Sequence, residues 1–273
     1  GFKRIWRVSS LKLIFLFRVK FNHRASFFYD AVRLQDFETV KFIIREGTAL
    51  DQRFGLSGET LLHVAAKEGS LDTVQLLIDA GANRQARDNL GETPAMLAAR
   101  EGYDLVLCAL LRSKEATLDE FNNDNQNLLS IASSQGNLRA VKVILEKGAI
   151  VNCSDRFGRT ALSKAIKESA NSVVRPLLQA QASVNKINLS GNSLVHMAVK
   201  VKNAQGLEIL LEREWGTHFE TYNNKGKTPF HIALDIGHLG TVIPLLQASC
   251  DVNMIDMCNR TALETAFLSG NYH

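Results

Sequence analysis

The feature that most constrains this chain is a block of about 33 residues that recurs along it. One copy begins Gly-Glu-Thr-Leu-Leu-His-Val-Ala-Ala at Gly58, and the next begins Gly-Glu-Thr-Pro-Ala-Met-Leu-Ala-Ala at Gly91. Further copies begin at Gly158, Gly191 and Gly226, with a degenerate copy at Asn125 and a cut one at Asn259. The starts are 33, 34, 33, 33, 35 and 33 residues apart. A chain of this kind grows by stacking units, each packed on its neighbours.

Each block carries signals for the start and end of short helices, such as Gly81, which ends the second helix in the copy at Gly58. Threonine recurs where a helix N-cap is needed, and proline follows it at the first helical position in two copies. These caps are Thr60, Thr93, Thr160 and Thr228. In the copy at Gly58 the spacing predicts helices over residues 61–67 and 71–80. Pro176 and Pro244 share one register of the second helix, where the missing N–H should bend it.

A period of 33 built on Thr-Pro-Leu-His-x-Ala resembles the ankyrin-repeat family from about Phe27 to the end, most closely at Thr228-Pro229-Phe230-His231-Ile232-Ala233. The resemblance implies an all-α solenoid of about seven helix-pair repeats plus a truncated C-terminal one. It also implies that His63, His196 and His231 tie neighbouring turns through hydrogen bonds. Residues 1–24 are expected to be an extension or cap, and 25–273 the repeat domain. The repeats are expected near 25–57, 58–90, 91–124, 125–157, 158–190, 191–225 and 226–258, with a partial one at 259–273.

Charge divides the chain unevenly. Residues 1–24 hold seven Lys or Arg and no acid, so a chain of net charge +4 leaves −3 for the rest. A net negative repeat body argues against nucleic acid as the partner. Four cysteines without a C-x-x-C motif indicate reduced thiols. We therefore expect a cytoplasmic monomer.

Residues 1–24 combine this basic charge with aromatic and aliphatic side chains and leave three readings open. The segment covers the exposed end of the first repeat or is poorly ordered, lies on an anionic membrane surface, or is a transit peptide. Its longest uncharged apolar run, residues 13–17, is far shorter than the roughly twenty residues of a membrane span. The chain opens on Gly1 and stops inside a repeat, so we expect a piece of a longer protein.

No catalytic motif stands out. The sequence has no G-x-S-x-G, P-loop, H-E-x-x-H or dinucleotide-binding glycine pattern, and its glycines fall at repeat turns. We therefore expect no enzyme activity, cofactor or metal within these residues. A protein-interaction scaffold is the leading hypothesis. The alternatives are the ankyrin region of a larger effector enzyme or cation channel, and an adaptor held at a membrane surface by residues 1–24.

By resemblance, partners contact a concave groove made by the first helix of each repeat and the hairpin tips. Aligning the repeats on Lys67 places Arg100, Ser134, Lys167, Lys200 and Asp235 at one position. Four of these six residues are basic, which predicts an acidic partner surface and binding that salt weakens. Aromatic tip residues are candidate anchors. The predicted partner-binding residues are Lys67, Arg100, Lys164, Lys167, Lys200, Arg84, Arg87, Leu90, Arg156, Phe157 and Tyr222.

Overall fold

The computed structural model describes residues 24–47, 49–112, 118–212, 215–268 and 270, with side chains from Phe28 onward. The basic segment expected at 1–24 lies outside these residues, apart from Arg24 at the start of the first helix. The chain divides into two units, residues 1–124 and 125–273. We describe each unit by itself. In the described ranges no helix combines the length and hydropathy needed to cross a membrane.

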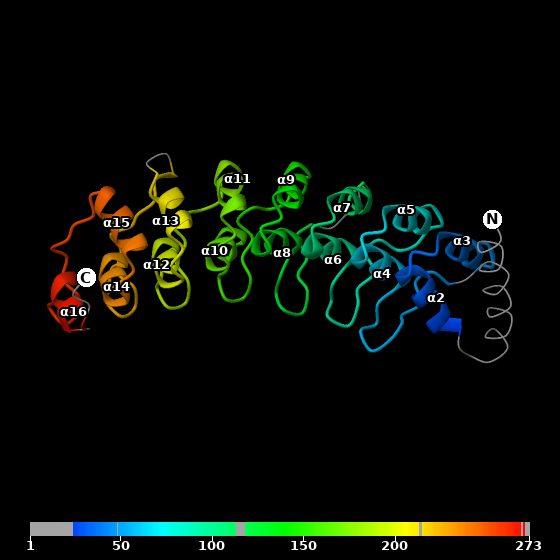
Figure 1. Cartoon of the computed structure of the whole chain (residues 1–273), viewed down its shortest axis with the longest axis horizontal. Helices are drawn as coiled ribbons and strands as arrows, with labels where there is room; N and C mark the ends of the chain where they lie inside the picture. Colours follow the sequence, from blue (N-terminus) through cyan, green and yellow to red (C-terminus); the bar gives the residue numbers. More distant parts are fainter. Residues whose placement is uncertain (1–23, 48, 113–117, 213–214, 269, 271–273) are drawn as a thin grey trace, which may run out of the picture. The chain divides into compact units, whose positions relative to one another are not determined.

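The described residues of the first unit form three helix pairs. They are α2 (Arg24–Arg33) with α3 (Phe37–Arg45), α4 (Leu61–Lys67) with α5 (Leu71–Asp79), and α6 (Pro94–Glu101) with α7 (Asp104–Leu110). The first helices pack in the order α2, α4, α6 and the second helices in the order α3, α5, α7 (Figure 1). The predicted helix at 61–67 is confirmed, and its partner ends one residue earlier than predicted.

The second unit repeats this layout. Its first helices are α8 (Leu128–Ser134), α10 (Ala161–Lys167), α12 (Leu194–Lys200), α14 (Pro229–Ile236) and the unpaired α16 (Ala262–Leu268). Its second helices are α9 (Leu138–Glu146), α11 (Val174–Gln179), α13 (Ala204–Leu211) and α15 (Leu239–Gln247). Figure 1 shows the two rows, with the connecting hairpins extending beyond the row of first helices. In the described ranges, β-structure is limited to isolated bridges within hairpins. The predicted all-α helix-pair architecture is confirmed.

Local sequence explains where the first helices start. Thr60, Thr93, Thr160 and Thr228 are all N-cap residues, as predicted. In α10, for example, Thr160 Oγ1 accepts a hydrogen bond from the backbone N–H of Ser163 at 3.2 Å. Such a bond satisfies a donor that the helix leaves unpaired and is worth about 1 kcal/mol.

The two prolines differ more than their shared register suggests. In repeat five the second helix begins as a 3₁₀ turn, Asn171–Val173, and α11 starts only at Val174. Pro176 therefore lies in the first turn of the α-helix, where no backbone N–H is needed. Pro244 lies inside α15. At Pro176 the expected loss of a helical hydrogen bond is avoided, because the α-helix starts just before it. At Pro244 the proline is accommodated within α15.

Buried histidines connect neighbouring repeats inside each unit. His63 Nε2 lies 2.9 Å from the carbonyl oxygen of Glu92, and His196 Nε2 lies 2.9 Å from that of Lys227. A carbonyl only accepts, so Nε2 carries the proton and donates. The Nδ1 atom of each ring faces its N-cap hydroxyl, at 2.9 Å from Thr60 and 2.8 Å from Ser193. The histidines are structural ties between repeats, as the resemblance implied.

We expect the free energy of unfolding to fall as the pH drops from about 7 to about 5. Burial lowers the pKa of His63 and of His196 below the ordinary 6.5. A base with a lowered folded pKa takes up protons on unfolding, so its contribution is complete above the unfolded value and declines below it. The upper limit is about 1.4 kcal/mol per histidine per pH unit. Urea titrations measure this slope. A His63→Gln/His196→Gln variant should show a shallower slope, and equal slopes would contradict the assignment.

Candidate protein-binding surface

The predicted partner-binding residues occupy two kinds of site within the units. The first is the C-terminal end of a first helix, which carries Lys67 on α4, Arg100 on α6, Lys167 on α10 and Lys200 on α12. The second is the hairpin between repeats, which carries the other predicted residues apart from Lys164. Those hairpin residues are Arg84, Arg87 and Leu90 in the first unit and Arg156, Phe157 and Tyr222 in the second.

In the first unit the two helix-end cations are neutralised within their own repeats. Lys67 Nζ lies 3.3 Å from Glu59 Oε1, and the carboxylate of Glu59 is buried. The guanidinium of Arg100 contacts both carboxylate oxygens of the buried Glu92, one of them at 2.8 Å. Partial burial alone would lower the pKa of Lys67, but the Glu59 carboxylate outweighs it and the pKa is raised. These cations therefore hold the hairpin to the helix.

The two positions of this ion pair are eight residues apart and vary along the chain. In repeat seven the charges are exchanged, and Lys227 pairs with Asp235. In repeats five and six the acid is missing, because Arg159 and Asn192 stand at the position of Glu59. Four repeats carry a basic residue at the end of the first helix. In two of them, repeats five and six, the residue eight positions earlier is not acidic.

Lys167 and Lys200 are accordingly the more available cations. Lys167 pairs with Glu168, the next residue in the chain, and both side chains are about half exposed. Such an exposed pair is worth little. Lys200 Nζ donates to the neutral side-chain oxygen of Asn192 at 2.8 Å. Burial and the nearby charge of Lys225 lower the pKa of Lys200, opposite to the shift of Lys67.

Lys164 does not belong to an exposed surface. It is 6% exposed and lies on the buried side of α10. Its Nζ is 3.3 Å from Ser130 Oγ and 3.8 Å from Asp155 Oδ2. Sequence reasoning placed it near the helix-end row because it is basic, but it stands three residues earlier, at the position of the buried Val64. We therefore leave Lys164 out of the binding surface.

The hairpin tips expose large apolar side chains. Leu90 and Tyr222 are exposed, and Phe157 is 40% exposed. Arg87, in contrast, is engaged, since it pairs with Glu120 and donates to the carbonyl oxygen of Phe121 at 2.9 Å. Sequence reasoning missed Ile187 and Leu189, which are 61% and 76% exposed on the hairpin that follows Phe157. A sequence signal exists for Leu189, which is apolar where other hairpins carry Asn89, Asn123, Arg156 and Asn224.

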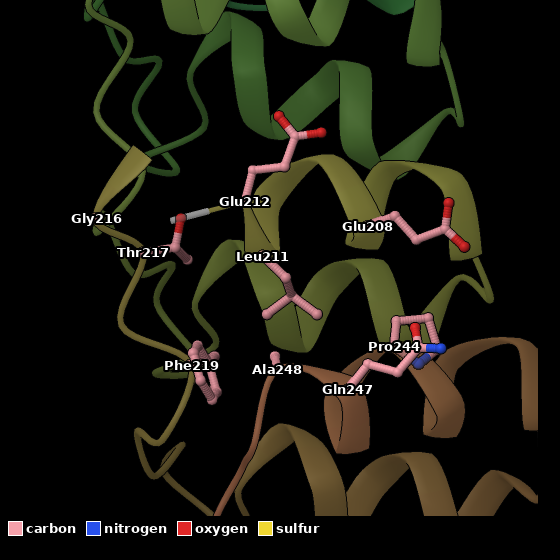
Figure 2. A pocket seen from close by; sticks show the side chains of 9 residues that line it. All are labelled: Glu208, Leu211, Glu212, Gly216, Thr217, Phe219, Pro244, Gln247 and Ala248. Atoms are coloured by element: carbon pink, nitrogen blue, oxygen red, sulfur yellow. The ribbon is translucent and has the colours of Figure 1, made fainter. Parts of the chain in front are cut away.

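A pocket of about 500 Å³ lies on the other side of the second unit, between α13 and α15. Its apolar part includes Leu211, Phe219 and Pro244, and Glu208 and Glu212 stand at its edge. Figure 2 shows the carboxylate of Glu212 pointing away from Leu211 and Ala248. That carboxylate is bound to the guanidinium of Arg175, at 2.9 Å for the longer contact. The pocket thus combines apolar and polar lining residues, and one of its two carboxylates, that of Glu212, is already bound to an arginine.

Groups that carry out chemistry do not converge in the described ranges. There, no cluster of three or more His, Cys, Asp or Glu side chains is placed to hold a metal ion. The four cysteines are free thiols, and burial raises the pKa of Cys250 to about 11. A thiol with a raised pKa is a poor nucleophile.

Comparison with known proteins matches the sequence to a family. A family profile described as "Ankyrin repeats (3 copies)" matches residues 28–122 and 109–188, and one described as "Ankyrin repeat" matches residues 225–257. The chain belongs to the ankyrin-repeat family. Ankyrin repeats are generally protein–protein interaction modules. The buried histidines and the hairpins described above are recurring parts of the repeats in this chain.

Relatives of this ankyrin-repeat chain include large proteins. It is 26% identical over 189 residues to neurogenic locus notch homolog protein 1 of Mus musculus and 26% identical over 183 residues to notch homolog protein 2 of Homo sapiens. These matches cover 69% and 67% of this chain but only 6% of each relative. The ankyrin repeat domain of Bcl-3, described as a unique member of the IkappaB protein family, superposes with a TM-score of 0.68 at 28% identity. That match covers 80% of this chain and 97% of Bcl-3's.

A second solved structure shows the fold alone. The human ASB11 ankyrin repeat domain superposes with a TM-score of 0.67 at 19% identity, covering 77% of this chain and 98% of that one.

Proposed function

We propose that this ankyrin-repeat chain is a non-catalytic scaffold that binds an acidic surface of a partner protein through repeats five and six. The observation that carries the proposal is the loss of the internal acid beside the helix-end cations of these repeats. Glu59 and Glu92 form ion pairs with Lys67 and Arg100 inside the fold. Where Arg159 and Asn192 replace these acids, Lys167 and Lys200 remain for a partner.

The proposed surface therefore keeps only Lys167 and Lys200, in the second unit, from the predicted row of basic residues. Arg156 on the hairpin before α10 adds an exposed cation, and Lys186 adds another on the hairpin before α12. Exposed like charges of this kind speed association with an acidic surface and select against basic ones, more than they add affinity. The interaction should weaken as salt shortens the range of the field.

A charge-reversal experiment tests this proposal. Lys167→Glu/Lys200→Glu should abolish the capture of proteins that the original chain retains from a cell extract at about 0.15 M salt. The control is Lys142→Glu/Lys147→Glu, which makes the same charge change at exposed residues of the second-helix side, in and just after α9. Pull-down with mass spectrometry at low and high salt is the measurement. The proposal fails if the two variants retain the same proteins as the original chain.

A further inference from the structure

Asparagine ties join several neighbouring hairpins at their tips. Asn123 donates its backbone N–H to the carbonyl oxygen of Leu90 at 2.9 Å and its side-chain amide to that of Asn89 at 3.0 Å. Asn89 and Asn224 make the same two bonds to the hairpins before them. The acceptors are Ser57 and Leu56 for Asn89, and Ser190 and Leu189 for Asn224.

Each tie also covers the repeat glycine of the preceding hairpin. Gly91 has a φ of +72°, and a Cβ on it would lie 2.7 Å from Asn123 Oδ1. Gly191 is covered by Asn224 in the same way. We call the gap between two successive hairpin tips a step. In a tied step the asparagine fills the space over the glycine.

The step between the hairpin at residues 155–158 and the hairpin at 188–191 is open. Leu189 stands at the position of the asparagine and has no amide to donate. In this stretch, which the structure describes throughout, no hydrogen bond joins Leu189 to Arg156 or Phe157. Gly158, with the same φ of +72° as Gly91, has no atom within 4 Å of a Cβ built on it.

The open step is apolar in the middle and basic at its edge. Phe157, Ile187 and Leu189 are its exposed apolar side chains. The guanidinium carbons of Arg156 and Arg159 each lie 4.8 Å from the centre of the Phe157 ring. Arg159 is already engaged, because its Nε lies 2.7 Å from Oδ2 of the buried Asp155. Lys186 Nζ donates to the carbonyl oxygen of Asn152 at 3.2 Å, which connects the two hairpins. The cations available at the edge are therefore Arg156 and Lys186.

We propose that this open step binds an extended, acidic segment of a partner protein that carries a large apolar side chain. This inference rests on the proposed function and names its contact point. The apolar side chain of the segment covers Leu189 and Phe157, and its carboxylates meet Arg156 and Lys186. The Leu189 N–H and the Phe157 carbonyl, which a tie would join, are left to pair with the backbone of the segment, as in strand addition.

A protein segment fits this surface better than a nucleic acid does. Binding of a single strand depends on aromatic faces on which successive bases stack. Two of the three apolar side chains here, Ile187 and Leu189, are aliphatic and offer no such face. An apolar side chain flanked by carboxylates satisfies both the apolar centre and the basic edge.

Substituting Leu189 with asparagine is the decisive test, because it should rebuild the missing tie. Random peptides displayed on phage are selected on the full chain, and enriched sequences are synthesised and measured by fluorescence anisotropy. We expect sequences in which Asp or Glu flanks Leu, Ile, Phe or Trp. Leu189→Asn should weaken their binding about tenfold or more while leaving the melting temperature unchanged or higher. Met257→Asn makes the same change at the equivalent position of the last hairpin and should leave binding unchanged.

Three outcomes would overturn the inference. The first is that no enriched peptide loses affinity in Leu189→Asn. The second is that Met257→Asn weakens binding as much as Leu189→Asn does. The third is that a single-stranded RNA probe binds in a Leu189-dependent way and displaces the peptide. If Lys167→Glu/Lys200→Glu abolishes partner capture and Leu189→Asn has no effect on peptides or partner, the proposed function stands and only the open step is wrong.

Discussion

Ser130→His alone should destabilise the second unit by about 2 to 4 kcal/mol, and combining it with Lys164→Ile should recover most of that loss. Ser130 stands at the position of His63, whose ring reaches the next hairpin. The serine hydroxyl is too short for that contact, and Lys164 from the next repeat fills the space with its ammonium group 3.3 Å from the hydroxyl. An added imidazole displaces this cation from its acceptor while leaving it buried.

The chain itself contains the repaired arrangement. The residue at the position of Lys164 is Leu97 in the repeat after His63 and Ile232 in the repeat after His196. A histidine is therefore followed by an apolar residue, and the serine is followed by a lysine. With isoleucine at 164, a histidine at 130 can donate to the carbonyl of Arg159, the equivalent of Glu92.

A double-mutant cycle measures this coupling. Urea unfolding of the four proteins should give an interaction energy of about 1 to 3 kcal/mol in favour of the double variant. Ser163→His is the matched control, because Met197 already supplies an apolar residue at the coupled position, so its effect should be much smaller. Additive effects of the two substitutions would show that Lys164 does not replace the missing histidine.

Arg100→Asp should destabilise the first unit by about 3 to 5 kcal/mol, because it leaves the buried carboxylate of Glu92 facing a like charge. The Glu92→Lys/Arg100→Asp double variant should recover at least half of the loss. It copies the exchanged pair of Lys227 and Asp235, which the second unit already contains. The expected recovery is incomplete because Asn122 donates to Glu92 at 3.0 Å and loses this acceptor.

Lys167→Asp is the control for this pair. It changes the same helix position by the same charge, but its acidic neighbour Glu168 is exposed, so the change should be below about 1 kcal/mol. Thermal and urea unfolding of the full chain compare the variants. Equal losses in the free energy of unfolding in Arg100→Asp and Lys167→Asp would contradict the view that only Arg100 neutralises a buried carboxylate.

The period of the sequence was sufficient to predict the architecture, because each repeat carries the same caps, turns and apolar positions. Thr160 could be assigned as an N-cap from its recurring position, and His196 could be assigned as a tie between repeats from the resemblance to the ankyrin-repeat family. The cut repeat at Asn259 likewise appears as the single helix α16. The architecture could be predicted because the same signals recur in successive repeats.

The candidate site was harder to predict, because it depends on how repeats differ. A count of basic residues at one position treated Lys67 and Lys200 as equal, although a carboxylate eight residues earlier neutralises only the first. Lys164 was assigned to the surface for its charge, although its neighbours bury it. Leu189 was overlooked because the role of the asparagine it replaces becomes visible only in the hydrogen bonds between hairpins.

The proposed binding surface is tested by mapping the bound surface on the full chain. Backbone amide chemical shifts are recorded with and without an acidic peptide enriched by selection. We expect shifts at the hairpins 155–158 and 188–191 and at the C-terminal ends of α10 and α12. Shifts confined to the second helices α11, α13 and α15, on the side of the pocket in Figure 2, would contradict the proposed surface.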